Sequence, residues 1–335
     1  MDNPRTSNLP FPVEPGHRRR PVAGWLLSAV GHIAMYILVG GWFLGWGIAL
    51  EHWGNLPGLA LFVATAPLIF ITFPSMAALV ARGRRMRALP ALELLQHERQ
   101  APVVLLRSFN DDDLIDPSYP ATNRVVPDRY ENRLIEALVP LGPAVALGRP
   151  GEREPELGAA RMYVKHEHWQ HAVTWLMERA AVVVAVVGAS PGLWWEIELA
   201  IEQIPLHRLL FFFPYPAPAK TRHSYWRTAF LQHQVWGRFI RRKLFPSMDA
   251  ERQARYQAFR ERISPRLPHP LPNTLGNARF IAFSTEGRPQ LIKPAVPSKL
   301  TRVLTMNFDP RMDIPFKREL QSFVSSRLME QARPR

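Results

Sequence analysis

Two long apolar runs, separated by a short polar link, dominate the first hundred residues. The first run spans residues 23–50 and the second spans residues 56–80, with the link at residues 51–55. Each run exceeds the roughly 20 residues that a helix needs to cross the hydrocarbon core of a bilayer. The first run is also too long for the apolar core of a cleaved signal peptide, which is the competing interpretation. The pattern therefore predicts a transmembrane helical hairpin over residues 23–82.

Basic residues flank this hairpin at both ends but are missing from the link. Three arginines at residues 18–20 precede the first run, and four arginines within residues 82–87 follow the second. Lys and Arg are enriched in the cytoplasmic loops of membrane proteins. We therefore expect a multi-pass protein of the cell inner membrane with both termini in the cytoplasm. Residues 1–22, which are polar and rich in proline, are predicted to form a disordered cytoplasmic tail.

Short apolar runs alternate with amphipathic segments after a juxtamembrane linker at residues 83–100. Apolar runs of this length predict buried strands, and amphipathic segments of helical period predict helices. The expected strands lie at residues 103–106, 144–147, 181–187, 209–213 and 278–283, and the expected helices lie at 130–138, 169–179 and from 191 onward. This alternation is typical of a parallel, doubly wound α/β sheet. We place the α/β domain at residues 101–292.

The segment Ala180 to Glu202 has the strongest pattern in the chain. Its continuous apolar run predicts a central parallel strand that is covered on both faces. Ser190 is expected to cap the following helix and Pro191 to begin it. Trp194 and Glu198 are four residues apart and therefore share one face of this helix. Ligands of open α/β sheets collect beyond the carboxyl ends of the strands, so we expect this face to look into a crevice there.

Residues 217–272 interrupt the alternation and are strongly basic. They contain twelve Lys and Arg against three acidic residues. We expect one or two basic helices here, broken near Pro246. Because the domain is tethered to a membrane, anionic lipid is the expected partner of the basic cluster, and no nucleic acid is expected. The cluster consists of Arg238, Arg241, Arg242 and Lys243. The alternative is a helix packed on the domain with its arginines in water. Residues 293–335 are predicted to be a tail with a helix at about 316–328.

The composition excludes several kinds of chemistry. The chain of 335 residues has a formal net charge of +14 and no cysteine. Disulfides, thiolate metal sites and a cysteine nucleophile are therefore excluded. The acids and histidines at residues 166–171 match no established zinc spacing, and the run Asp111 to Asp113 is interpreted as a solvated loop. We predict no metal and no bound cofactor.

Three loops are expected to meet at one edge of the sheet, because parallel strands have their carboxyl ends there. The first loop follows the strand at 103–106, the second follows the strand at 144–147, and the third follows the strand at 181–187. Their candidate binding residues are Arg107, Ser108, Phe109, Asp111, Arg149, Gly151, Ser190 and Trp194, with Glu198 as the candidate catalytic residue.

The same loops resemble a Toll/interleukin-receptor (TIR) homology domain. The similarity lies in VVLLRSFNDDD at 103–113, ALGRPGE at 146–152 and WWEIELA at 194–200. The last phrase is similar to the family's Trp-Cys-x-x-Glu-Leu pattern and aligns Glu198 with its Glu. The resemblance covers about residues 101–214, with the strand at Phe280 as the last one, and implies a flavodoxin-like parallel sheet for the domain at 101–292. Three departures mark a divergent branch: Trp195 at the position of the Cys, an extended loop at 152–168, and the basic insert.

This resemblance implies one of two functions for a membrane-anchored signalling or defence effector. Some members of the family cleave NAD at the nicotinamide glycosidic bond with the Glu that matches Glu198, and others act by binding a nucleotide signal or one another. Cleavage of this bond develops positive charge on the ribose, which a carboxylate stabilises. Arg107 or Arg149 would then hold the pyrophosphate. The plainer alternative is that Glu196, Glu198 and Glu202 are solvated positions of an amphipathic helix.

Overall fold

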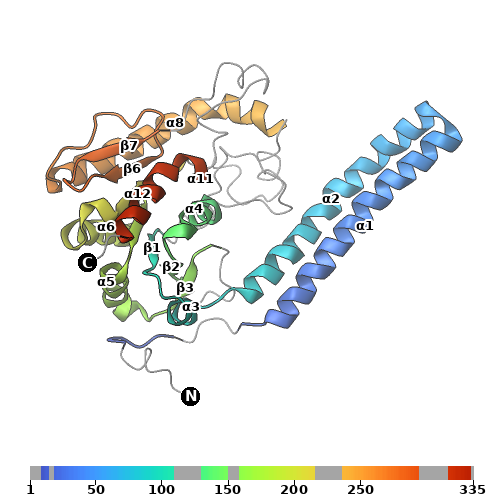
Figure 1. Ribbon diagram of the computed structural model, residues 1–335. Helices are drawn as coiled ribbons and strands as arrows, with labels where there is room; N and C mark the ends of the chain where they lie inside the picture. The colour runs from blue at the N-terminus through green and yellow to red at the C-terminus, as the bar shows by residue number, and fades with distance from the viewer. Residues whose placement is uncertain are drawn as a thin grey trace.

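A computed structural model describes residues 9–14, 19–108, 130–149, 158–215, 236–293 and 316–332 (Figure 1). A long helical hairpin leads into an α/β domain built on one sheet. The one-turn 3-10 helices lie at Val139–Leu141, His166–His168, Leu206–Arg208 and Ser264–Arg266.

The hairpin consists of α1 (Pro21–Trp53) and α2 (Asn55–Arg87), which run side by side in opposite directions (Figure 1). Gly54 makes the turn with φ of 83°, a conformation that favours glycine. Near the other end, a Cβ atom on Gly24 would lie 2.5 Å from the carbonyl oxygen of Gly83, so glycine permits this close approach. Among the described residues, α1 alone is long and apolar enough to span a bilayer. The second crossing stays a prediction.

The sheet contains β1 (Val103–Leu106), β2 (Ala144–Leu147), β3 (Ala160–Met162), β4 (Val182–Val186), β5 (Leu209–Phe212), β6 (Phe280–Phe283) and β7 (Pro289–Ile292). The spatial order is β3-β2-β1-β4-β5-β6-β7. The first five strands pair in parallel, whereas β6 and β7 are antiparallel. The predicted α/β class and its mostly parallel sheet are confirmed.

The sheet differs from the expected flavodoxin-like order, 2-1-3-4-5, in two ways. The strand β3 lies at the edge beside β2, inside the region that we predicted to be a polar loop. Its three residues are too few to give a recognisable strand pattern in the sequence. The strand is instead stabilised by its pairing with β2 and by the burial of Met162. In addition, β6 joins β5 in the antiparallel direction.

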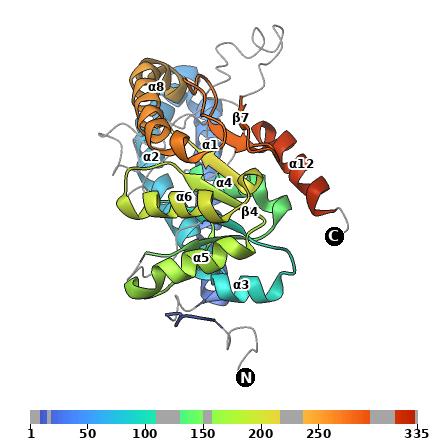
Figure 2. The ribbon, with the colours of Figure 1, turned by 90° about the vertical axis from the view of Figure 1, so that its left-hand side faces the viewer.

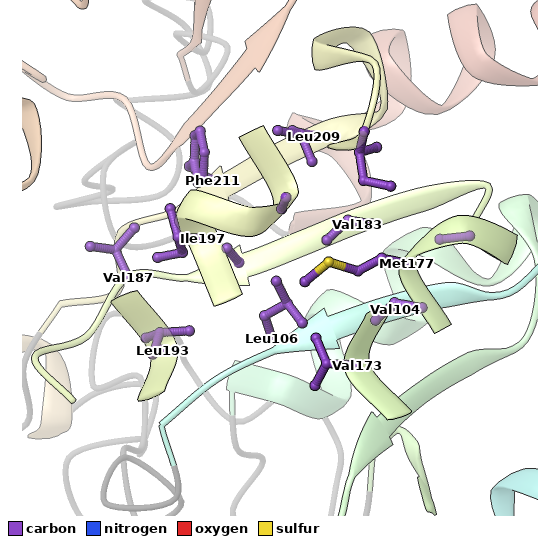
Figure 3. Packing of buried hydrophobic residues seen from close by; sticks show 14 of the residues in the cluster. Val104, Leu106, Val173, Met177, Val183, Val187, Leu193, Ile197, Leu209 and Phe211 are labelled. Atoms are coloured by element: carbon purple, nitrogen blue, oxygen red, sulfur yellow. The ribbon is translucent and has the colours of Figure 1, made fainter. Parts of the chain in front are cut away.

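Two layers of helices cover the sheet. The helices α5 (Trp169–Arg179), α6 (Pro191–Gln203) and α8 (Trp236–Ile263) lie on one face, and the short α3 (Ala91–His97) packs at the same side (Figure 2). Figure 3 shows the close packing of this face, where Ile197 and Met177 meet side chains of β1 and β4. The helices α4 (Tyr130–Leu138), α11 (Phe316–Glu319) and α12 (Gln321–Gln331) cover the other face.

The segment 9–14 corrects the prediction that residues 1–22 form a disordered tail. Val13 forms an antiparallel bridge with Val164, and the N–H of Glu14 donates to the carbonyl oxygen of Tyr163 at 2.9 Å. Phe11 is buried, and its ring lies edge-on to Trp175 at 6.1 Å between centroids. Burial of this aromatic ring offsets the entropy cost of ordering a polar segment.

The helix α8 corrects the prediction of a break at Pro246, because it continues through this proline. A proline inside a helix costs about 3 kcal/mol. The turns after Pro246 offset this cost by burying Tyr256, Phe259 and Ile263 against the sheet. The predicted lipid-binding residues lie in the earlier turns of α8, where the structure describes the helix but not the side chains.

The helices α11 and α12, which we expected as one helix in a tail, belong to the domain. Phe316 and Leu320 are buried against Phe212 and Phe280 of the sheet. The guanidinium of Arg279, which precedes β6, forms a buried ion pair with the carboxylate of Glu319. The apolar core on the α4 face of the sheet is therefore completed by residues that lie far from most of the strands in sequence.

We predict that Glu319→Gln destabilises the domain by about 3–5 kcal/mol, because it removes the carboxylate charge that pairs with the buried Arg279 guanidinium. Chemical unfolding of the full chain in detergent, followed by tryptophan fluorescence, measures this change. The matched control is Glu286→Gln, whose ion pair with Arg288 lies in solvent and contributes little. Equal midpoints for both variants would contradict a stabilising role for the buried pair.

Candidate functional site

The helix α6 presents its acids on two opposite flanks. Leu193, Ile197 and Ala200 are buried against the sheet. With 100° between successive residues, Glu198 lies on one flank of this buried stripe and Glu196 lies on the other. The two carboxylates, only two residues apart in sequence, therefore meet different neighbours.

The Glu198 flank faces α8. The Nε atom of Arg262 donates to the Glu198 carboxylate at 2.7 Å, and Nη2 of Arg266 lies 3.2 Å from its second oxygen. The side chain of Glu198 is 19% exposed. Its negative charge is thus balanced by two guanidinium groups.

Trp194 contacts the same helix. Its ring stacks on Phe259 of α8 with centroids 5.9 Å apart, and the guanidinium carbon of Arg262 lies 4.7 Å from the centroid of the indole. We expected Trp194 and Glu198 to look into a crevice with the tip of β1. The structure instead brings both residues against α8, because the basic insert folds back over α6.

The tip of β1 belongs to a buried ionic cluster. The Nε atom of Arg107, directly after β1, lies 3.4 Å from the carboxylate of Glu131 in α4. The same carboxylate lies 2.7 Å from Nη2 of Arg161 in β3 and accepts the N–H of Ala159 at 3.1 Å. All three charged side chains are at most 5% exposed. One glutamate thus joins α4, β3 and the end of β1.

Gly158 makes this cluster sterically feasible. Its φ is 139°, and a Cβ atom there would lie 2.4 Å from the Oε1 atom of Glu131. A larger residue would strain the backbone and collide with the carboxylate. The approach of Glu131 to β3 therefore requires glycine.

The Glu196 flank faces a small cavity between the sheet and α5. The cavity is lined by residues 104–107 at the end of β1, Leu147 of β2, Val173 and Leu176 of α5, and Glu196. About 20 Å³ is open to the centres of water-sized groups, which is room for one or two of them. Among these lining residues, Glu196 is the one acid.

Burial raises the pKa of Glu196 from 4.5 to about 8. The cause is the loss of hydration, which disfavours the charged carboxylate. No hydrogen bond or ion pair joins this carboxyl to another residue in the part of the chain that the structure describes. A partly buried acid with a raised pKa beside a strand tip is a feature of functional sites in α/β proteins.

The other predicted site residues have separate positions. Ser108 is buried beside Arg107, and Ser190 caps α6 by accepting the N–H of Leu193 at 3.4 Å. Arg149 is exposed after β2. Phe109, Asp111 and Gly151 lie outside the described residues.

Sequence reasoning missed Glu196, Glu131 and Arg161. The order in the TIR pattern selected Glu198, although helical geometry already places Glu196 on a different flank of the same helix. Nothing in the local sequence pairs Glu131 with Arg161, because their contact depends on the position of β3.

No group of three or more His, Asp or Glu side chains is arranged to hold a metal ion within the described part of the chain. Comparison of the chain with protein-family models, characterised proteins and solved structures gave no significant match.

We predict that Glu196→Gln makes the stability of the domain less dependent on pH. Between pH 4.5 and about 8 the folded protein keeps the Glu196 proton while the unfolded chain releases it. The free energy of unfolding of the parent protein should therefore fall as pH rises, by up to about 1 kcal/mol for each pH unit. Denaturant unfolding between pH 5 and pH 8 measures this slope.

The control for this experiment is Glu198→Gln, which removes an acid from the other flank of α6. The free energy of unfolding of the parent should fall steadily below that of Glu196→Gln as pH rises across the range, and the gap should level off above pH 8. Parallel stability curves for the parent and Glu196→Gln would show that the carboxyl of Glu196 titrates normally.

Proposed function

We propose that this chain is a membrane-anchored, TIR-like signalling or defence module whose α/β domain binds a nucleotide at the carboxyl edge of β1 and β2. Parallel sheets bind ligands in the crevice beyond the carboxyl ends of their strands, near the point where the strand order reverses. In this sheet the order reverses between β1 and β4. Arg107, Ser108 and the cavity beside Glu196 lie at the β1 end of that region.

One observation favours binding over cleavage of the ligand. The Glu198 carboxylate is bound by Arg262 and Arg266. A carboxylate that stabilises a positively charged ribose must keep its own negative charge available. The two arginines neutralise this charge in the described arrangement, which supports a module that recognises a nucleotide without hydrolysing it.

The membrane part of the proposal has two crossings, by α1 and α2. Large apolar side chains of α1, including Trp25, Ile33, Tyr36 and Leu44, are more than half exposed, as lipid-facing residues are. The segment 9–14 and the domain touch one another through Val13 and Val164. They must therefore lie on the same side of the bilayer. One crossing would separate them, so the contact supports an even number of crossings.

The distribution of positive charge favours the cytoplasm as that side. Four arginines within residues 82–87 end α2 next to the domain. Contact of Arg238, Arg241, Arg242 and Lys243 with anionic lipid, and self-association of the chain at the membrane, remain part of the proposal.

Site-directed cysteine labelling tests the two crossings. Because the chain has no native cysteine, only the introduced residue can react with the label. We expect Asn55→Cys, at the start of α2, to react with a membrane-impermeant maleimide in intact bacterial spheroplasts that produce the full chain. Gln100→Cys, just before the domain, should react only after the membrane is permeabilised. Reaction of both variants in intact spheroplasts, or of neither, would contradict two crossings.

Calorimetric titration of the full chain in detergent with NAD tests nucleotide binding. We expect saturable binding at pH 7 that Arg149→Gln weakens at least tenfold, since this exposed arginine follows β2 at the proposed binding edge. The matched control is Arg255→Gln, which removes an exposed arginine of α8 paired with Glu251. No nicotinamide should be released, and Glu198→Gln should bind NAD within about twofold of the parent. Absence of NAD binding would reject NAD as the ligand.

Hydrolysis of NAD at the glycosidic bond is the second candidate function. Its supporting observation is that both charge partners of Glu198 are partly exposed arginines, 48% and 42%, of a single region, the end of α8 and the turn after it. The double variant Arg262→Ala, Arg266→Ala would free the carboxylate. Nicotinamide release by this variant, abolished by adding Glu198→Gln, would establish the hydrolase.

A further inference from the structure

We infer that the cavity beside Glu196 binds a primary carboxamide of the ligand, through two hydrogen bonds between the amide and the Glu196 carboxyl group. This inference rests on the proposed nucleotide-binding function and names the chemical group that the site selects. It assigns a binding role to an acid that the TIR resemblance leaves without one.

The position of Glu196 is the first support. Its side chain lines the cavity from α6, while Val173 and Leu176 line it from α5 and residues 104–107 line it from β1. Most of the residues that line the cavity are apolar, and its two charged lining residues are Glu196 and Arg107. Within the described residues this carboxyl has no hydrogen bond of its own, which leaves its O–H free to donate to a ligand and its C=O free to accept from one.

Loss of hydration, and not a charged neighbour, favours the neutral form of the Glu196 carboxyl. Arg107 is the one other charged residue among those that line it. The guanidinium of Arg107 pairs with Glu131 of α4, which packs on the opposite face of the sheet. α5 and β2 contribute only apolar residues to the wall. The pKa of Glu196, raised to about 8 by burial, agrees with a neutral group at pH 7.

A neutral carboxyl presents one donor and one acceptor side by side. Its O–H donates and its C=O accepts, and a primary amide offers the matching pair in its C=O and NH₂ groups. The cavity admits one or two water-sized groups, which is the size of the oxygen and nitrogen of one amide. A ligand carboxylate has no donor and would bring a negative charge into an apolar cavity, so the site should reject it.

The test compares two dinucleotides that differ only in this group. NAD carries a carboxamide on its pyridine ring, and nicotinic acid adenine dinucleotide carries a carboxylate at the same position. We expect the full chain in detergent at pH 7 to bind the acid at least tenfold more weakly than NAD, as measured by calorimetric titration. Equal affinity for both dinucleotides would overturn the inference while leaving nucleotide binding intact.

Variants of Glu196 distinguish its hydrogen bonds to the ligand amide from the packing of its side chain. Glu196→Gln keeps a donor and an acceptor, so it should bind NAD within about threefold of the parent. Glu196→Leu removes both and should weaken NAD binding at least tenfold. Raising the pH from 7 to 9 should weaken binding to the parent several-fold and leave Glu196→Gln unchanged. Tight binding by Glu196→Leu would overturn the inference.

Small probes distinguish failure of the cavity from failure of the proposed function. Nicotinamide and nicotinate contain the amide and the acid without the nucleotide, and ligand-observed NMR detects their weak binding to the full chain. Binding of nicotinamide that depends on Glu196, without binding of NAD, would support the cavity and reject the nucleotide function. Binding of neither nicotinamide nor NAD would reject both.

Discussion

The parallel pairing of β1 with β4 is the constraint on which the rest of the domain depends. Four successive residue pairs, from Val103 opposite Val182 to Leu106 opposite Ala185, join the two strands in the centre of the sheet. Both strands are buried along their whole length, so a shift in register would move apolar side chains out of both cores. The register also sets where Arg107 and the start of α6 lie relative to one another.

The rotation of α6 about its own axis then decides which acid meets which neighbour. The stripe of Leu193, Ile197 and Ala200 fixes this rotation, because turning the helix would expose it. Glu198 is held against the arginines of α8, and Glu196 is held beside the sheet. Two glutamates separated by a single residue thus meet different neighbours.

Much of the fold follows from apolar patterning. The strands β1 and β2 and the helix α5 lie where the sequence predicts them, because each has a continuous run or a helical period of its own. The apolar pattern does not predict elements that are stabilised by contacts with residues distant in sequence. The strand β3 has only three residues and the segment 9–14 is polar. Pro246 argues against a continuous α8.

The candidate site was predicted less completely than the fold. The sequence placed Arg107 and Ser108 at the tip of β1 correctly, since a parallel sheet brings that tip to a known edge. The sequence analysis selected Glu198 and not Glu196, because a short motif identifies a residue by its position along the chain and not by its neighbours in space. Whether a side chain meets solvent, an arginine or an apolar wall depends on the elements packed beside it, such as α8.

The position of α11 and α12 has a consequence for biosynthesis. These helices cover the face of the sheet that contains Phe212 and Phe280, and they lie far downstream of the apolar hairpin. During translation, α1 and α2 leave the ribosome long before the apolar core on the α4 face can close. One face of the nascent domain's sheet therefore stays partly uncovered until the last helices emerge, which makes a chaperone useful at that stage.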